Sequence, residues 1–257
     1  MNINPRKPAH WLRIGVALLP LWMGLGGCQT PHHLTAQNAT RLTIDGAVPT
    51  DSSTLRWLAP YKQGLDKNMN ETLVNLSERL DKTAPESALT DLLADALLAQ
   101  ATQRYGKPID VAHLNYGGIR SGLPAGALTT GNIFEVMPFD NQLVVLTLTA
   151  DQLNQFMDQV VAHEGSLVVG GVHVRVANKK TTTTLDNGRT IGPGQTYAVA
   201  MSDYVANGGG GADFLKTVTT RQNSNYLIRD ALIDYFRAEG KNGKLLSPKA
   251  NGRITIE

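Results

Sequence analysis

The amino-acid sequence predicts a layered α+β domain that covers most of the 257 residues. Helical and strand patterns alternate irregularly after residue 42, without the steady strand–helix–strand rhythm of a doubly wound parallel sheet. The same stretch shows no linker-like change of composition and no internal repeat, which favours one domain over residues 42–257. Hydrophobic residues make up 42% of the chain and charged residues only 18%, a balance typical of a chain that folds around an apolar core.

The first 27 residues have the pattern of a secretory signal peptide. Arg6, Lys7 and Arg13 supply positive charge, and an uncharged run of about twelve residues follows over 14–25. A membrane-spanning helix needs roughly 20 apolar residues, so this run is too short to be one. We therefore expect residues 1–27 to be removed from the mature protein.

Cys28 is the expected attachment point for lipid. The segment Leu25-Gly26-Gly27-Cys28 resembles a bacterial lipobox, and it comes directly after the uncharged run. A core thiol is the alternative, and this position disfavours it. The polar residues 28–41 then form a tether. Because Gln29 rather than Asp follows the cysteine, we expect a cell-envelope lipoprotein in the outer membrane that faces the periplasm.

The charge balance argues against a nucleic-acid partner. The formal charge of the whole chain is +2, but three basic residues belong to the predicted signal peptide. Without them, 21 basic residues face 22 acidic ones, so no basic field remains to attract a phosphate backbone.

The expected elements follow from periodicity and turn residues. The clearest helix begins at Ser87, has apolar residues at helical spacing from Leu89 to Leu97, and ends at Gly106. A buried strand before Gly117-Gly118 and a β-rich strand before an amphipathic helix come next. The expected helices are 55–69, 87–105, 132–137, 150–162 and 225–238. The expected strands are 109–115, 142–149, 166–176, 197–202 and 253–256. Residues 71–80 are ambiguous between strand and helix, and 181–194 are expected to be a loop or hairpin.

Three segments at predicted strand ends carry candidate binding residues. Asn115 to Arg120 contains two glycines, which let backbone N–H groups approach a ligand, and an arginine that suits phosphate or sugar oxygens. Pro138 to Asn141 and Ser202 to Gly211 each place one aromatic ring at the edge of a loop. The rings could face each other across a slot that holds a flat base. The alternative is an ordinary turn, a ring that covers the core, and a flexible loop.

In this order, the three segments resemble the C-terminal domain of bacterial 5'-nucleotidases and related nucleotide hydrolases. Residues 85–96 resemble the helix that opens that domain, and the likeness covers roughly 44–257. The resemblance implies a four-layer α/β/α/β fold. It also implies a nucleobase clamped by Phe139 and Tyr204, with Asn141 at the base and Arg120 toward the phosphate or sugar. The implied substrate-binding residues are Asn115, Gly117, Gly118, Arg120, Phe139, Asn141, Tyr204, Gly208 and Gly209.

The sequence departs from the family pattern at two places. The family usually has an Asp that faces the ribose where this chain has Gly210, so we expect weaker or altered sugar recognition. Thr90-Asp91 stands where the family commonly has Gly-Asn, and Asp91 would repel a phosphate that lay nearby.

No catalytic or metal-binding residues are assigned to this chain. The family cleaves phosphate esters with two metal ions in a separate N-terminal domain, held by Asp-x-His, Asn-His and His-x-His segments. The folded part here has only His113, His163 and His173 and none of these segments. The resemblance therefore implies no cofactor in this chain, with divalent metals on a separate metallophosphatase partner.

Three functions remain open. The first is recognition of a nucleotide or nucleoside in a 5'-nucleotidase-type system whose catalytic part is a separate metallophosphatase. The second is a stand-alone binding or interaction lipoprotein with a decayed pocket. The third is an autonomous hydrolase built on Ser121, Ser202, Asp203 and His173, which no Gly-x-Ser-x-Gly elbow supports.

Overall fold

The computed structural model describes residues 41, 49–186, 188–241 and 243–257, and Ser52–Glu257 form one compact unit. The predicted signal peptide, Cys28 and all but the last residue of the tether lie outside the described residues. Within them, no helix is both long and apolar enough to cross a bilayer.

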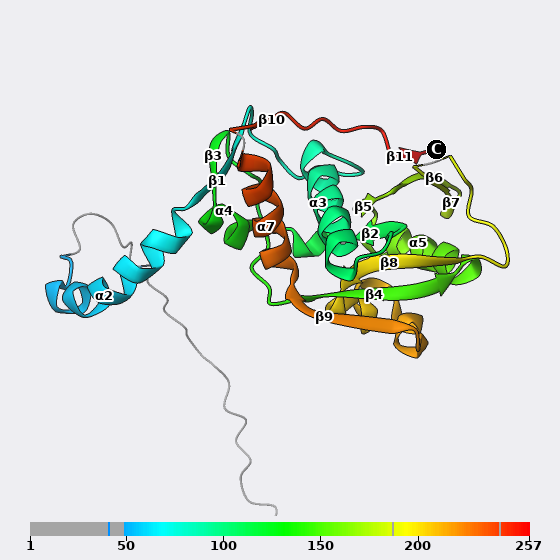
Figure 1. Cartoon of the computed structure of the whole chain (residues 1–257), viewed down its shortest axis with the longest axis horizontal. Helices are drawn as coiled ribbons and strands as arrows, with labels where there is room; N and C mark the ends of the chain where they lie inside the picture. Colours follow the sequence, from blue (N-terminus) through cyan, green and yellow to red (C-terminus); the bar gives the residue numbers. More distant parts are fainter. Residues whose placement is uncertain (1–40, 42–48, 187, 242) are drawn as a thin grey trace, which may run out of the picture. The chain divides into compact units, whose positions relative to one another are not determined.

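A five-stranded mixed sheet lies at the centre of the unit, in the order β5-β2-β8-β4-β9 (Figure 1). Only β2 and β8 pair in parallel, and the other neighbours are antiparallel. The strands are β2 (Val111–His113), β4 (Gln142–Thr149), β5 (Val169–Gly170), β8 (Thr196–Ser202) and β9 (Arg221–Leu227).

Helices cover both faces of this sheet because its central strands are apolar on both sides. In β4, Leu143 and Val145 belong to one buried cluster, whereas Val144 and Leu146 belong to the other, as the alternation of a strand requires. The first cluster includes residues of α3 (Ala88–Tyr105) and α7 (Ile228–Gly240), which lie side by side in Figure 1. The second includes residues of α5 (Ala150–Glu164).

Two three-stranded sheets complete the layers. One has the order β10-β1-β3 and packs on α7, and the other has the order β11-β6-β7 and packs on α5. The result is a mixed α/β domain with alternating sheet and helix layers. The strands are β1 (Thr72–Leu76), β3 (Gly126–Thr129), β6 (Val172–Ala177), β7 (Lys180–Leu185), β10 (Leu245–Leu246) and β11 (Ile254–Ile256). The remaining helices of the described residues are α2 (Ser52–Met69), α4 (Thr130–Val136), α6 (Asp203–Ala206) and the 3₁₀ turns η1 (Tyr116–Gly118), η2 (Gly209–Gly211) and η3 (Asp213–Thr217).

The helix predicted from Ser87 is confirmed as α3. The Ser87 hydroxyl accepts a hydrogen bond from the Thr90 amide, and Gly106 ends the helix in the left-handed conformation at φ 64°. The strand expected over 166–176 is split into β5 and β6 at Gly171. That glycine has φ 82°, and a Cβ there would lie 2.3 Å from the Asp110 carbonyl oxygen.

The helix expected over 225–238 is wrong at its start, because residues 221–227 form β9. This strand is mostly polar and pairs only with β4 at the edge of the sheet, so it lacks the apolar alternation that identifies a strand. The ambiguous stretch 71–80 contains β1. Of the stretch 181–194, the first part is β7, which forms a hairpin with β6 through Asn178 and Lys179.

Candidate functional site

Four segments meet at one end of the strands of the five-stranded sheet. Leu143 pairs with Ser202, so the start of β4 lies beside the end of β8. Because β2 runs parallel to β8, the turn that follows β2 lies at the same end of the strands. The helix α5 begins at the opposite end of β4 and packs back along the sheet, which returns its last residues to the same end as Ser202.

A pocket of about 540 Å³ lies among these segments, a size within the usual range for small-molecule sites. It includes most of the predicted site residues. Its lining residues are Asn115, Tyr116, Gly117, Gly118, Phe139, Asn141, His163, Glu164, Tyr204 and Gly210. Arg120, Gly208 and Gly209 are not among them, and the exposed Arg120 guanidinium instead donates to the Gly117 carbonyl at 3.0 Å.

Phe139 and Tyr204 both line this pocket, and neither is part of the core. Phe139 is 43% exposed and Tyr204 50% exposed, and neither belongs to a buried cluster. Large apolar side chains are usually buried, so two half-exposed rings that line the same pocket are an informative exception. Their surfaces are available for a flat ligand.

Hydrogen bonds to Asp203 join the segment that carries Phe139 to the segment that carries Tyr204. The Asp203 carboxylate accepts hydrogen bonds from the amides of Gln142 at 3.0 Å and Tyr204 at 2.9 Å. The tyrosine ring lies against the backbone of Gly209, where an added Cβ would come within 2.4 Å of the ring. Gly209 therefore supports the position of Tyr204 without lining the pocket.

A buried arginine holds the Phe139 segment. The Arg229 guanidinium donates to Asp140 Oδ1 at 2.6 Å and to the Phe139 carbonyl at 3.5 Å, and it stacks 4.1 Å from the centre of the Phe134 ring. The Asn141 carbonyl accepts from the Ile228 amide at 2.9 Å. These contacts fix the backbone on both sides of Asp140 and so orient Phe139 and Asn141.

The glycine turn after β2 is fixed by Glu164 and Lys82. Glu164 Oε2 accepts from the Tyr116 amide at 2.7 Å. The Lys82 ammonium donates to the carbonyls of Tyr116 at 3.1 Å and Ile119 at 2.7 Å, and it lies 4.2 Å from the centre of the Tyr116 ring. The Asn115 amide packs over Gly118, where a Cβ would lie 2.9 Å from it.

Among the residues that line the pocket, Glu164 is the one carboxylate, and none is a lysine or an arginine. Burial raises the pKa of Glu164, and the hydrogen bond from Tyr116 opposes that shift. Burial lowers the pKa of Lys82, with a further contribution from the charge of Arg120. The Lys82 ammonium is thus already bonded to the backbone, which leaves it less able to neutralise a phosphate.

Three residues that the sequence did not predict also line the pocket: Tyr116, His163 and Glu164. The last two end the amphipathic helix directly before Gly165, and only the strand order shows that this helix end reaches the pocket. Gly210, the position where the family usually has an acid, does line the pocket. Glu164 Oε1 lies 3.4 Å from the place that a Cβ of residue 210 would occupy.

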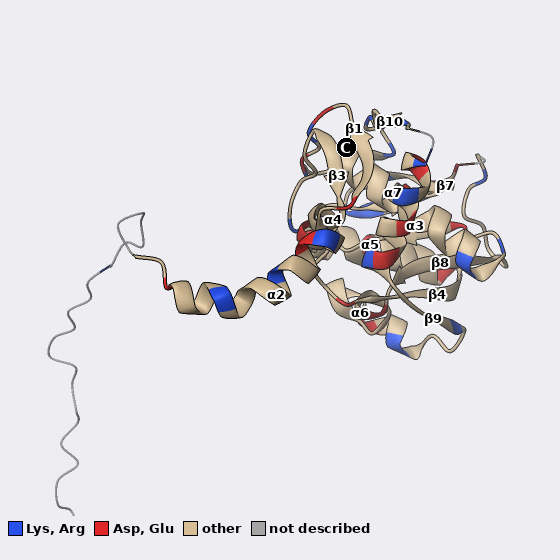
Figure 2. Cartoon of the chain, turned by 60° about the vertical axis from the view of Figure 1, so that its left-hand side comes forward, with Lys and Arg blue, Asp and Glu red and all other residues tan. Residues whose placement is uncertain are grey.

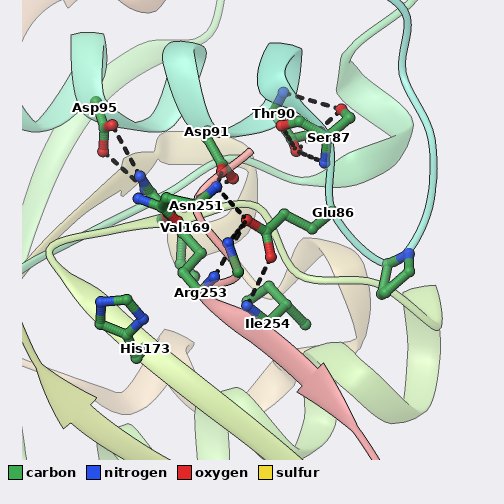
Figure 3. Close-up of polar contacts among 12 residues, drawn as sticks. Glu86, Ser87, Thr90, Asp91, Asp95, Val169, His173, Asn251, Arg253 and Ile254 are labelled. Carbon is green, nitrogen blue, oxygen red and sulfur yellow. Dashed lines mark hydrogen bonds and ion pairs between the residues drawn. The ribbon is translucent and has the colours of Figure 1, made fainter. Parts of the chain in front are cut away.

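Asp91 does not lie in this pocket, so the condition under which it would repel a phosphate is not met there. Its carboxyl belongs to a buried cluster at the start of α3, beside Glu86, Asn251 and Arg253 (Figure 3). Asp91 Oδ1 lies 3.6 Å from Arg253 Nε, and Oδ2 accepts from the Asn251 amide at 3.2 Å. Burial and a hydrogen bond shared with the Glu86 carboxyl raise the pKa of Asp91 to about 7.

The described residues include no group of three or more His, Cys, Asp and Glu side chains placed to hold a metal ion. His113 is buried edge-to-face against Phe156, with ring centres 5.0 Å apart, and burial lowers its pKa to about 4. His173 lies 3.7 Å from Asp186.

The serines considered for an autonomous hydrolase have structural partners. Ser202 Oγ accepts from the Val205 amide at the start of α6, and Ser121 Oγ donates to the Gly122 carbonyl. Asp203 is occupied by the two amides described above. None of these contacts joins a serine to His173, so they do not form a Ser/His/Asp relay.

Comparison with known proteins identifies the family. Residues 68–217 match the family described as 5'-nucleotidase, C-terminal domain. The chain belongs to this family. The predicted resemblance is thereby confirmed, together with the hydrolase family and the mixed α/β fold.

Curated relatives agree with this assignment. The trifunctional nucleotide phosphoesterase protein YfkN of Bacillus subtilis is 28% identical over 239 residues, which cover 84% of this chain and 16% of that protein. Protein UshA of Yersinia enterocolitica is 26% identical and the 5'-nucleotidase of Vibrio vulnificus 27% identical, each over 76% of this chain and 36% of the relative. The chain thus spans about a third or less of these family members.

Solved structures confirm the fold. The 5'-nucleotidase precursor from Thermus thermophilus superposes with a TM-score of 0.68 at 24% identity, over 81% of this chain and 44% of that one. A 5'-nucleotidase structure from Staphylococcus aureus gives a TM-score of 0.62 at 17% identity, over 86% and 45%. At these identities the likeness establishes the family's fold.

Proposed function

We propose that this chain recognises the nucleoside part of a substrate in a 5'-nucleotidase-type system. The observation that carries the proposal is the placement of Phe139 and Tyr204, both half-exposed, in one pocket with the amides of Asn115 and Asn141. A base that stacks on an aromatic ring gains roughly 1–3 kcal/mol. Side-chain amides offer both donors and acceptors, which suits the polar edge of a base.

Glu164 suits the sugar better than a phosphate. One carboxylate oxygen holds the Tyr116 amide, and the other faces the space that Gly210 leaves without a side chain. We propose that this second oxygen accepts a hydrogen bond from a sugar hydroxyl, in place of the acid that the family usually has at position 210. A phosphate at the same place would meet a like charge.

We further propose that cleavage belongs to a separate metallophosphatase that receives the nucleotide held here. The relatives named above as nucleotidases or phosphoesterases are longer than this chain, which matches their C-terminal family domain.

Anchoring through lipid on Cys28, in the outer membrane facing the periplasm, completes the proposal. Intact-mass measurement of the membrane-extracted protein tests the anchor.

Calorimetric titration of the detergent-solubilised full chain with adenosine, uridine and guanosine tests the binding function. At least one nucleoside is expected to bind in the micromolar-to-millimolar range, roughly −8 to −4 kcal/mol. Phe139→Ala and Tyr204→Ala should each weaken binding by about 1–3 kcal/mol because each removes one stacking surface. Their melting temperatures should stay close to that of the wild type, since both rings are half-exposed.

Tyr61→Ala is the matched control, because Tyr61 is also an exposed aromatic but lies in α2, outside the pocket. It should leave nucleoside affinity unchanged. Absence of nucleoside binding at millimolar concentration would favour the decayed pocket instead. Equal affinity in the wild type and in both pocket variants would show that the rings do not clamp a base.

A further inference from the structure

The helix α2 exposes an unusual amount of apolar surface. None of its residues is buried, and five of the nine large exposed hydrophobic side chains in the described part of the chain belong to it. These five are Leu55, Trp57, Leu58, Tyr61 and Leu65. Soluble surfaces rarely gather apolar side chains in this way unless something covers them.

The apolar side chains of α2 share one face. Trp57, Tyr61 and Leu65 follow each other at intervals of four residues, and Leu58 fits between them at intervals of three. The rings of Trp57 and Tyr61 are in contact, with centres 5.8 Å apart. Gln63 and Lys67 fall on the opposite side of the helix by the same spacing. The helix is therefore amphipathic with an unpartnered apolar face.

The composition of α2 favours a lipid surface over a protein groove. Trp and Tyr on the apolar face are the residues that accumulate at the boundary between headgroups and acyl chains. Arg56, Lys62 and Lys67 outnumber the one acid, Asp66, so the helix carries net positive charge. Figure 2 shows it as a mainly tan helix with blue basic segments. Basic residues beside an apolar face attract anionic headgroups.

The sequence distance to the expected anchor is compatible with membrane contact. Ser52, the first residue of α2, follows Cys28 by 24 positions. A chain of that length reaches at most roughly 80 Å, so a lipid on Cys28 would keep α2 within that distance of the bilayer. One lipid chain alone binds membranes weakly, and a second contact strengthens the attachment.

We propose that α2 is an interfacial helix whose apolar face, from Leu55 to Leu65, lies in the surface of a bilayer with anionic headgroups. The helix would lie along the membrane plane without crossing it. This inference deepens the proposed lipoprotein anchor and is independent of what the nucleoside pocket binds.

Tryptophan fluorescence tests it directly. The chain has three tryptophans, so a full chain with Trp11→Phe and Trp22→Phe reports on Trp57 alone, whether or not the signal peptide is removed. This protein is returned from detergent to vesicles of phosphatidylethanolamine and phosphatidylglycerol. Trp57 emission should shift to shorter wavelength, lose accessibility to acrylamide, and be quenched by lipids brominated near the headgroup end of the acyl chain.

Two single substitutions of equal charge provide the matched comparison. Leu65→Glu places a charge on the apolar face and should lower the quenching by brominated lipids at least severalfold. Gln63→Glu places the same charge on the polar face and should leave most of the quenching by brominated lipids unchanged. Because neither position is buried, both variants should fold like the wild type. Vesicles of phosphatidylcholine alone should give weaker quenching than the anionic vesicles.

Flotation and adenosine titration of the same samples separate this inference from the proposed function. Protein that floats with the vesicles while Trp57 stays accessible to acrylamide overturns the interfacial helix and leaves the anchor standing. If a second copy covers α2, Trp57 is shielded from acrylamide but is not quenched by brominated lipids, and this result also overturns the interfacial helix. Quenched Trp57 in a protein that binds no nucleoside would support the helix while it contradicts the pocket.

Discussion

At the scale of single residues, Glu164 and Gly210 line the same pocket as Phe139 and Tyr204. Gly210 supplies no side chain, and the carboxylate of Glu164 approaches the space that such a side chain would fill. In the proposed function, the acid that accepts from the sugar is at the end of α5 instead of in the glycine-rich turn. Glu164 also accepts from the Tyr116 amide, and this contact holds the glycine turn in place.

Glu164→Gln should therefore change selectivity while it preserves the turn. The Gln carbonyl oxygen can still accept from the Tyr116 amide, which turns the uncharged NH2 toward the sugar hydroxyl. The hydrogen bond there then loses its charge, reverses its direction and weakens. We expect adenosine affinity to fall about tenfold, within the range for a hydrogen bond to a charged group. AMP should lose less, because repulsion of its phosphate also disappears. Titration with both ligands at pH 8 measures the change in their affinity ratio.

Glu135→Gln is the control for that measurement. Glu135 is an exposed acid of α4 and does not line the pocket, so its neutralisation should leave both affinities unchanged. An affinity ratio that does not move in Glu164→Gln would exclude the carboxylate as a ligand-selecting group.

At the scale of elements, the start of α3 is joined to β11 through a cluster of acids and one arginine. Glu86 accepts hydrogen bonds from the amides of Gly252 at 2.8 Å and Ile254 at 2.8 Å, and Arg253 pairs with Asp95 at 2.7 Å (Figure 3). Asp91 lies beneath this junction, only 5% exposed. Burial disfavours the charged form of Asp91, and two carboxyls that share one hydrogen bond cannot both ionise without cost, so the pKa of Asp91 is raised to about 7.

This arrangement predicts a pH-dependent gain in stability for Asp91→Asn. The pKa of Asp91 is about 7 in the folded chain and near 3.9 when unfolded, so the folded state holds the extra proton between these values. Stability contributed by this group therefore falls as pH rises from about 4 to 7. Asn imitates the protonated acid and removes that fall. The melting temperature of Asp91→Asn minus that of the wild type should increase as pH rises from 5 to 8.

The comparison between variant and wild type removes the effect of other groups. Burial lowers the pKa of His113 to about 4, which makes stability rise with pH over part of the same range, but it does so equally in both proteins. The pKa of Glu86 is lowered, so its stabilising contribution is lost only as pH falls below the ordinary glutamate range. A constant difference in melting temperature between pH 5 and 8 would contradict the proton on Asp91.

For the whole molecule, the proposal predicts recognition without cleavage. The purified full chain with added Mn²⁺, Zn²⁺ or Mg²⁺ should hydrolyse neither AMP nor UDP-sugars, because its described residues include no group of His, Cys, Asp and Glu placed to hold a metal ion and the family's metal-binding segments do not occur in its folded part. Assays for phosphate from AMP and for UMP from UDP-sugars, before and after addition of a separate metallophosphatase domain, measure this. Steady turnover that a chelator abolishes would contradict the prediction, and turnover that survives the chelator would favour the autonomous hydrolase.

Local sequence patterns were sufficient for the strongest elements of the fold. Ser87 and Gly106 mark the two ends of α3 because a cap and a left-handed glycine act within one turn of the helix. The β-rich run of β4 and the apolar spacing of α5 are likewise local. The edge strand β9 and the short β3 and β10 could not be predicted in this way, because pairing with a neighbour defines them more than their own composition does.

The sequence alone determined the family, the general α+β character and the two aromatic residues at loop edges, Phe139 and Tyr204. Only the tertiary structure decided which groups share a pocket. It brought Glu164 to the aromatic residues, left Arg120 outside, and placed Asp91 in a different cluster. The physical reason is that strand order and register determine which loops meet at the ends of the strands. Those pairings are made between segments far apart in the chain, so no local pattern records them.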